Sequence, residues 1–470
     1  MTQNSLKFGT SGLRGLVVDL AGDAARVYTS AFLRHLEASA ERADTLYIGR
    51  DLRPSSQAIA ADCIAAAAAL GVRPVDCGAL ATPALALHAM AADAPSIMVT
   101  GSHIPSDRNG LKFYRRSGEI TKADEAGIVA HVRGAERGDY TVSGVDETEA
   151  AKLRYLQRFE HVLPPKALAG WRLGVFEHSS VAREALAAIL TAFGADVVSL
   201  GRVEHFVAVD TEAFGDPVFA PLAHWLRDHN LDAIVSADGD GDRPLLMDGK
   251  GRFVRGDTLG LLTALFLKAQ AVVTPVTSNT AVEALGAFQS VIRTRVGSPY
   301  VIEGMQGVSG SGTSVIGFEA NGGTLLGTAI ELERGTLTAL MTRDAALPLI
   351  CAIGLAARQG KTLADMVDAL PLRSALSDRL TDVPAESSAA FLRRLSNADH
   401  AARHFSHRAV VRHADVDGLQ FWLDDGTMIH YRASGNAPEL RCYVEAGNAE
   451  QAREALAWGL KAAETALSPG

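Results

Sequence analysis

Two kinds of hydrophobic pattern follow one another along the first third of the chain. Short runs rich in β-branched and aromatic residues predict strands over residues 45–51, 73–78 and 96–102. Longer apolar runs predict helices over residues 55–71 and 82–93. Pro54 is placed to open the first of these helices, and Gly71 is placed to end it. Strands separated by helices predict right-handed β-α-β units in a mostly parallel sheet.

The same alternation of predicted strands and helices occurs twice more along the chain. Its second occurrence predicts strands over residues 171–180, 195–201 and 231–237, with a loop following the last of them. The third occurrence extends from residue 271 to a long apolar helix over 343–360. The last hundred residues differ, because short strands over 407–413, 419–425, 427–434 and 441–447 precede an amphipathic helix over 449–467. We therefore expect a C-terminal α+β domain, preceded by a polar linker over 374–387.

Composition and charge limit the classes of function. The chain has 470 residues, of which 47% are hydrophobic and 21% charged, as is typical of a globular protein. The net charge of −9 argues against a nucleic-acid partner but not against a small anionic substrate. We find no apolar run long enough to span a membrane and no signal peptide, so we expect a cytoplasmic protein. The four cysteines are too few for a disulfide framework, and we expect buried thiols.

A serine stands where the third predicted strand ends. Ser102 follows Gly101, which permits a sharp turn, and His103 and Lys112 are the nearby groups able to carry or transfer a proton. A hydrolase nucleophile would need glycine two residues before and after it, but Thr100 and Ile104 stand there. A serine that carries a phosphoryl group therefore fits better, with a purely structural turn as the alternative.

Three carboxylates are spaced by glycines in the sequence DGDGDR. Asp238, Asp240 and Asp242 can converge on one hard cation, which would relieve their mutual repulsion. An EF-hand would need glycine at its sixth position and an acidic residue at its twelfth, where this chain has Arg243 and Gly249. The pattern favours a divalent metal site over a calcium-binding EF-hand, with a solvated acidic turn as the alternative.

Two further polar loops can recognise a ligand. Glu319 and Asn321 follow a predicted strand and offer a carboxylate and an amide to neighbouring hydroxyl groups of a sugar. Ser434, Gly435 and Asn436 lie between Arg432 and Arg441, where hydroxyl, backbone N–H and guanidinium donors can hold a phosphate. A glycine-rich turn and a polar hairpin tip are the respective alternatives.

Taken in order, these motifs resemble the α-D-phosphohexomutase superfamily, in its phosphomannomutase and phosphoglucomutase branch. The resemblance begins with FGTSGLRG (residues 8–15) and GRDLRPSS (49–56). It continues through TGSHIP (100–105), DGDGDR (238–243) and GFEANGG (317–323), and ends with RASGNAPELR (432–441). It implies three α/β domains of similar topology with mixed or parallel sheets, over residues 1–147, 148–256 and 257–370. With an α+β domain over 371–470, these would surround a central cleft.

The resemblance also implies roles for individual residues. Ser102 matches the phosphorylated serine, and Asp238, Asp240 and Asp242 match ligands of Mg²⁺, whose shell an oxygen of the phosphorylated serine completes. The basic residues beside the serine would be Arg14 and Lys112. The residues implied in substrate binding are Arg243, Gly297, Ser298, Glu319, Asn321, Arg432, Ser434, Gly435, Asn436 and Arg441.

The sequence departs from the family pattern at two loops. Many members have histidine where this chain has Gly323, and threonine and glutamate where it has Asn436 and Ala437. The general acid and base therefore stay open among His103, Lys112 and Arg14.

The activity implied is the interconversion of hexose 6-phosphate and hexose 1-phosphate through a hexose 1,6-bisphosphate. Mannose is the preferred sugar, glucose is expected as well, and glucosamine is the less favoured alternative. A phosphatase using the same serine and a catalytically silent sugar-phosphate-binding protein are the rival functions. The oligomeric state stays open.

Overall fold

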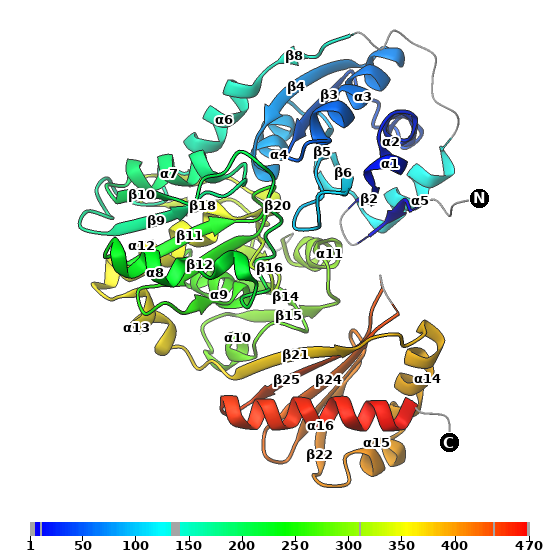
Figure 1. Cartoon of the computed structure of the whole chain (residues 1–470), viewed down its shortest axis with the longest axis vertical. Helices are drawn as coiled ribbons and strands as arrows, with labels where there is room; N and C mark the ends of the chain where they lie inside the picture. Colours follow the sequence, from blue (N-terminus) through cyan, green and yellow to red (C-terminus); the bar gives the residue numbers. More distant parts are fainter. Residues whose placement is uncertain (1–4, 10–11, 133–141, 310–311, 436–437, 468–470) are drawn as a thin grey trace. The chain divides into compact units, whose positions relative to one another are not determined.

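The chain forms two compact units in the computed structural model, which describes residues 5–9, 12–132, 142–309, 312–435 and 438–467. The first unit comprises Met1–Val273 and Gly297–Val367. The second comprises Thr274–Val296 and Asp368–Gly470. Figure 1 shows the course of the chain and the labels of its helices and strands.

The first sheet of the first unit has the strand order β1-β2-β6-β5-β3-β4-β8, and β7 (Gly118–Glu119) pairs with β6. Strands β3 (Thr45–Arg50), β4 (Arg73–Ala79), β5 (Ser96–Val99) and β8 (Val145–Asp146) are parallel. Strands β1 (Lys7–Phe8), β2 (Leu13–Leu16) and β6 (Arg108–Arg115) join them in antiparallel pairing. The accompanying helices are α1 (Val17–Leu20), α2 (Asp23–Ala38), α3 (Ser56–Ala69), α4 (Thr82–Ala91) and α5 (Lys122–Ala130).

Two more sheets complete the first unit. Strands β9 (Arg172–Phe176), β10 (Asp196–Leu200) and β11 (Ala233–Ala237) pair in parallel, and β12 (Pro244–Asp248) and β13 (Phe253–Val254) extend them in antiparallel pairing. In the other sheet, β14 (Ala271–Pro275), β16 (Val315–Phe318), β17 (Thr324–Leu326) and β20 (Leu340–Asp344) are neighbours in that order. The short strands β18 (Ile330–Leu332) and β19 (Gly335–Leu337) form a separate hairpin.

Helices connect these strands. They are α6 (Thr148–Gln157), α7 (Arg183–Ala192), α8 (Leu222–Asp228), α9 (Gly256–Phe266), α11 (Ser298–Ser309), α12 (Ala346–Gln359), the short η1 (Pro217–Phe219), and α13 (Leu363–Asp368), which runs to the boundary of the unit. Helix α12 ends at Gly360, whose left-handed backbone (φ 61°) closes the last turn, as glycine does most easily.

The second unit is built on an antiparallel sheet with the order β21-β25-β24-β23-β22. Its strands are β21 (Ser374–Leu380), β22 (Val410–Ala414), β23 (Leu419–Leu423), β24 (Met428–Ala433) and β25 (Leu440–Ala446). Alternate residues such as Phe421, Tyr431 and Val444 pack with apolar residues of α14 (Ala385–Leu395), α15 (Ala398–His404) and α16 (Ala449–Leu467). The unit also holds α10 (Ala281–Ala284) and β15 (Ser290–Thr294).

The predicted fold class is confirmed, and one expected feature is wrong. Each strand and helix predicted between residues 45 and 102 is present, and the C-terminal region is α+β. The predicted linker over 374–387 instead forms β21 and the start of α14, because β25 supplies a full register of partners from Ser374–Ala446 to Leu380–Leu440. Each of the four ranges proposed as domains contains one main sheet, and their boundaries stay a prediction.

Two further features concern the cysteines and the apolar helices. All four cysteines are buried and form no disulfide. Among the described helices, none combines the length and the apolar character that crossing a membrane requires.

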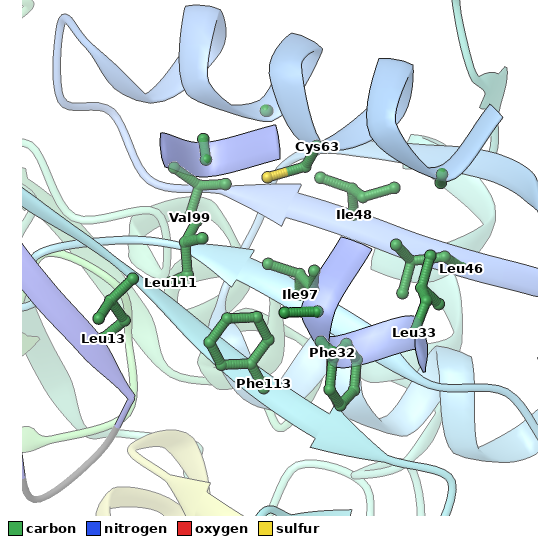
Figure 2. Close-up of a cluster of buried hydrophobic side chains, with 14 of the residues drawn as sticks. Leu13, Phe32, Leu33, Leu46, Ile48, Cys63, Ile97, Val99, Leu111 and Phe113 are labelled. Carbon is green, nitrogen blue, oxygen red and sulfur yellow. The ribbon is translucent and has the colours of Figure 1, made fainter. Parts of the chain in front are cut away.

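The core of the first sheet sets the position of the strands that carry polar residues. Phe113 of β6 packs against Phe32 of α2 with ring centroids 5.0 Å apart, and Ile97 and Leu111 lie beside them (Figure 2). Phe113 is 2% exposed. Close packing of this kind fixes the register of β6 against its neighbours.

Phe113→Ala is expected to lower the free energy of unfolding of the first unit by about 3–5 kcal/mol, since it removes a buried ring and leaves a cavity. Denaturation in urea followed by far-UV circular dichroism measures the change. Val18→Ala is the control, because Val18 is 85% exposed and its truncation should change stability by less than about 0.5 kcal/mol. A Phe113→Ala protein as stable as this control would contradict the role given to the ring.

Candidate functional site

Three neighbouring strands of the first sheet present basic and nucleophilic residues at one end. Ser102 follows β5, Lys112 lies on β6, and Arg14 lies on β2, opposite Gly110 of β6. The strand order β2-β6-β5 therefore brings together residues that are far apart in sequence. This is the edge of an α/β sheet at which ligands usually bind.

Ser102 is held in an uncommon backbone conformation. Its φ of 53° lies in the left-handed region, which costs a non-glycine residue on the order of 1 kcal/mol. The Ser102 N–H donates to Oγ1 of Thr100 at 2.8 Å, and its hydroxyl donates to Oδ2 of Asp238 at 2.6 Å. Nδ1 of His103 lies 3.3 Å from the same hydroxyl. The loop thus aims a 1%-exposed serine oxygen at the acidic loop.

The side chain of Arg53 holds this loop through hydrogen bonds to its backbone. This residue was not among those predicted from the sequence. Its guanidinium donates to the backbone carbonyls of Ser102 (2.9 Å), Ile104 (2.5 Å), Pro105 (2.6 Å) and Arg108 (3.0 Å). Nε donates to Oδ2 of Asp51 at 3.1 Å, which neutralises the buried charge. Arg53 therefore positions the serine through the backbone, without a contact to its hydroxyl.

Asp238, Asp240 and Asp242 all lie in the turn between β11 and β12 and are fully buried. Nζ of Lys112 donates to Oδ2 of both Asp240 and Asp242 at 2.5 Å. Burial, with the charges of Asp240 and Asp242, raises the pKa of Asp238 well above its usual range. Burial also acts to raise the pKa of Asp242, but the neighbouring cations, Arg343 foremost, hold it well below its usual range.

The acidic turn has the chemistry of a metal site. One ligand oxygen from each of its three carboxylates lies within 4.8 Å of the others. Within the described part of the chain, Oδ1 of Asp240 and Oδ1 of Asp242 are buried and have no hydrogen-bond partner. Buried carboxylate oxygens without donors are costly unless a cation satisfies them. These residues therefore fit a divalent cation that prefers oxygen ligands.

Basic side chains surround the serine and the acidic turn. Burial, with repulsion from Arg243 and Arg343, lowers the pKa of Arg14 to about 10, which leaves it charged at neutral pH. Burial and the charges of Arg243 and Arg14 lower the pKa of His103 to about 2. His103 is therefore a neutral imidazole at physiological pH. The positive charge of this region comes from the arginines and Lys112, which suits an anionic ligand.

Arg343 joins the acidic turn to the predicted sugar-recognition loop. The Nε and Nη2 groups of this 1%-exposed side chain donate to Oδ2 of Asp242 at 3.1 and 2.7 Å, and Nη1 donates to Oε2 of Glu319 at 3.0 Å. A Cβ added at Gly323 would lie 2.5 Å from Cδ of Arg343. The aliphatic part of the Arg343 side chain therefore occupies the space that a side chain at position 323 would need.

Three more predicted residues of the first unit are Asn321, which lies in a turn, and Gly297 and Ser298 at the start of α11. Oδ1 of Asn321 accepts the N–H of Gly323 at 2.9 Å. Gly297 has a φ of 130°, and the hydroxyl of Ser298 donates to Oε2 of Glu119 at 2.6 Å. The carboxylate of Glu119 thus holds the turn that begins α11.

The predicted phosphate-binding residues lie in the second unit. Arg432 and Arg441 stand directly opposite each other on β24 and β25, and Arg379 of β21 stands opposite Arg441. Like charges directly opposite in a sheet are unfavourable, and carboxylates of the same unit offset them here: Asp417 pairs with Arg432, and Glu439 pairs with Arg379 and Arg441. Nε of Arg432 donates to Oδ2 of Asp417 at 2.6 Å, and the N–H of Ser434 donates to the carbonyl of Glu439 at 3.0 Å. Gly435 is exposed, and Asn436 lies outside the described residues.

Comparison with known proteins decides the family. The sequence pattern of phosphoglucomutase/phosphomannomutase, alpha/beta/alpha domain I, matches residues 5–138, and that of domain III matches residues 255–373. A phosphomannomutase of Sinorhizobium fredii is 46% identical over 464 residues, covering 97% of this chain and 98% of the relative. A phosphomannomutase of Salmonella muenchen is 41% identical over 455 residues, covering 96% and 94%.

The chain belongs to the phosphoglucomutase/phosphomannomutase family. It is therefore an enzyme, a mutase of the isomerase class. A putative phosphomannomutase from Thermus thermophilus has the same fold, with a TM-score of 0.77 at 22% identity, covering 98% of this chain and 99% of that one.

Within the first unit of this mutase, the structure brings several predicted residues together. Hydrogen bonds or ion pairs link Ser102, His103, Lys112 and the three aspartates directly, and Arg343 adds Glu319 to them. Arg53 could have been noted in the sequence, because it lies in the matched segment 49–56. No sequence signal marks Arg343, which stands between Thr342 and Asp344 at the start of the predicted helix over 343–360 and lies in β20 instead, or Arg379, which lies in the supposed linker.

Proposed function

We propose that this mutase interconverts hexose 6-phosphate and hexose 1-phosphate through a phosphorylated Ser102, with mannose as the preferred sugar and glucose also accepted. The contact that supports this most is the hydrogen bond from the Ser102 hydroxyl to Asp238, in a cluster of carboxylates and cations. The names of the relatives at 46% and 41% identity support the choice of mannose. The reducing cytoplasm is the expected location, in keeping with the four buried thiols.

The reaction consists of two transfers of the same kind. In the first, the P–O bond to Ser102 Oγ breaks, and a P–O bond forms to the free hydroxyl oxygen of the hexose phosphate. The sugar hydroxyl loses its proton and the serine oxygen gains one, and the product is a hexose 1,6-bisphosphate. In the second, Ser102 takes the other phosphoryl group, so that the isomeric monophosphate is released and the enzyme is phosphorylated again.

The residues of the chain act mainly by placing charge, since phosphoryl transfer needs positioning and neutralisation more than covalent assistance. Arg14 and Lys112 would neutralise the phosphoryl oxygens beside Ser102. His103, neutral and with Nδ1 3.3 Å from the serine oxygen, is one candidate for proton transfer. Lys112 and Arg14 are the other candidates. Glu319 and Asn321 would bind sugar hydroxyl groups.

Asp238, Asp240 and Asp242 would hold Mg²⁺, with an oxygen of the phosphorylated serine as a further ligand. The ion, when bound, supplies positive charge beside the serine oxygen on which negative charge develops.

Asp240→Asn should raise the Mg²⁺ concentration needed for half-maximal activity by about tenfold or more, because it removes a charged ligand. Isothermal titration with Mg²⁺ measures the same loss without turnover. The exposed Asp228→Asn is the control, and equal affinity in both variants would contradict the assignment.

Arg432 should hold the phosphate that is not being transferred. Arg432→Ala is expected to raise KM by about tenfold or more and also to lower kcat, because remote binding energy keeps the reacting end in place. Steady-state kinetics with mannose 1-phosphate measure both constants. Arg393→Ala on α14, an exposed position, should change neither constant. Unchanged constants in Arg432→Ala would remove this residue from the substrate site.

Turnover of mannose 1-phosphate, glucose 1-phosphate and glucosamine 1-phosphate, side by side with Mg²⁺ and a trace of hexose 1,6-bisphosphate, tests the proposed function. We expect the highest kcat/KM for mannose 1-phosphate and a lower value for glucose 1-phosphate. Release of phosphate in excess of isomer would indicate a phosphatase. Binding without conversion of any of the three would indicate a silent sugar-phosphate-binding protein.

A further inference from the structure

A cavity of about 470 Å³ lies within the second unit, apart from the residues predicted to bind substrate. One wall is formed by β22 and β23, and the other by residues around α10 and β15. Its size falls in the range of sites for small organic ligands. The lining residues used below are Arg293, Arg373, Arg412, Gln420 and Trp422.

Two arginines of this cavity carry charge that no carboxylate offsets. Arg293 is neutralised, because Nε and Nη2 donate to the two carboxylate oxygens of Glu283 at 2.8 and 2.7 Å. Arg373 donates one side-chain hydrogen bond, from Nη2 to the carbonyl of Gly426 at 2.6 Å. Neither Arg373 nor Arg412 has an acidic partner within the parts of the chain that the structure describes. The cavity therefore offers two guanidinium groups to an anion.

An aromatic platform lies beside these charges. Arg412 and Trp422 are directly paired on β22 and β23, and the guanidinium carbon of Arg412 lies 3.8 Å from the centroid of the indole ring. Stacked arginine and tryptophan present a flat surface of the kind on which nucleobases stack. The platform supplies a contact that an inorganic anion or a sugar phosphate would not use.

A buried amide completes the lining. Gln420 is 7% exposed, and its Nε2 donates to the carbonyl of Val276 at 3.1 Å, which fixes the orientation of the amide. Among the described residues, no donor hydrogen-bonds to Oε1 of Gln420. This oxygen can accept a hydrogen bond from an N–H group of a ring that lies on the platform formed by Arg412 and Trp422.

We propose that this cavity is a binding site for a nucleoside phosphate. The base would stack on the platform formed by Arg412 and Trp422 and donate to Gln420, and the phosphates would accept hydrogen bonds from Arg373 and from the edge of the Arg412 guanidinium. Arg432, on β24, points to a separate site, because it is held by Asp417 and does not line the cavity. A nucleotide would accordingly bind without displacing a hexose phosphate.

Isothermal titration of the full-length wild-type protein with GDP and ADP tests the proposal, with inorganic phosphate and glucose 6-phosphate as comparison ligands. At least one of the two nucleotides should bind with a Kd below about 1 mM and more tightly than inorganic phosphate. Saturating glucose 6-phosphate should leave the nucleotide Kd unchanged. Failure of both nucleotides to bind, or their displacement by glucose 6-phosphate, would overturn the proposal.

Substitutions of the lining residues test whether the nucleotide binds in this cavity. Arg412→Gln and Trp422→Leu should each raise the nucleotide Kd by about tenfold or more, while Arg412→Lys, which keeps the charge but not the planar stack, should have an intermediate effect. Arg408→Gln is the matched control, because this arginine of the same unit pairs with Asp425 and does not line the cavity. Circular dichroism checks the fold of each variant, and wild-type Kd values in folded Arg412→Gln and Trp422→Leu proteins would refute the assignment. Since binding is measured without turnover, failure of the proposed mutase reaction would leave this test unaffected.

Discussion

Replacing Ser102 by alanine is expected to reduce mutase turnover by at least about four orders of magnitude. The variant lacks the oxygen that would carry the phosphoryl group, so neither transfer can occur. The hydroxyl is buried and donates to Asp238 at 2.6 Å, and among the described residues no other serine hydroxyl donates to this carboxylate. ³¹P NMR follows the conversion of mannose 1-phosphate to mannose 6-phosphate directly.

Ser106→Ala is the matched control for this experiment. Ser106 lies in the same loop, four residues after Ser102, and is exposed. Its replacement should leave kcat and KM within about twofold of the wild-type values. A Ser102→Ala protein that retained a tenth of the wild-type turnover would contradict the proposed role of this serine.

The second large effect is expected from Arg343→Met. The substitution keeps much of the volume but leaves the buried carboxylates of Asp242 and Glu319 without their shared guanidinium, which typically costs about 3–5 kcal/mol. Its absence would also raise the pKa of Asp242, because Arg343 is the main cation that lowers it. We expect kcat to fall by about a hundredfold or more and stability to fall with it. Steady-state kinetics and urea denaturation measure the two effects.

Arg343→Lys separates charge from geometry. Lysine keeps the charge but cannot contact Asp242 through two nitrogens and reach Glu319 at once. We therefore expect a folded protein with kcat well below the wild-type value. Arg334→Met, at an exposed arginine of the same unit, controls for the loss of a positive charge. Wild-type kcat in folded Arg343→Lys would show that this arginine has only a structural role.

The sequence predicts most of the strands and helices, because buried strands such as β9 and β11 are short apolar runs between turn residues. Strand β21 has no such pattern. It lies at the edge of its sheet, and its polar residues Ser377, Asp378 and Arg379 are consecutive and exposed. Its strand conformation depends on pairing with β25, which is distant in sequence.

The residues of the site differ in the same way: some are marked by local sequence patterns, and others depend on contacts between distant segments. Asp238, Asp240 and Asp242 are predictable because one turn carries all three, and Ser102 is predictable because a strand ends beside it. The contributions of Arg53 and Arg343 come from contacts between distant segments. Arg53 holds the carbonyl of Ser102, 49 positions after it, and Arg343 pairs with Asp242, 101 positions before it. Local patterns do not encode such contacts.

Transfer of labelled phosphate from the enzyme is the most direct test of a mutase that works through a phosphorylated Ser102. Protein carrying ³²P on Ser102, confirmed by peptide mass, is mixed with unlabelled mannose 1-phosphate in a single turnover. We predict that the label passes to hexose 1,6-bisphosphate and hexose monophosphate faster than it appears as inorganic phosphate. Label that stays on the protein, or that is released only as inorganic phosphate, would contradict the account.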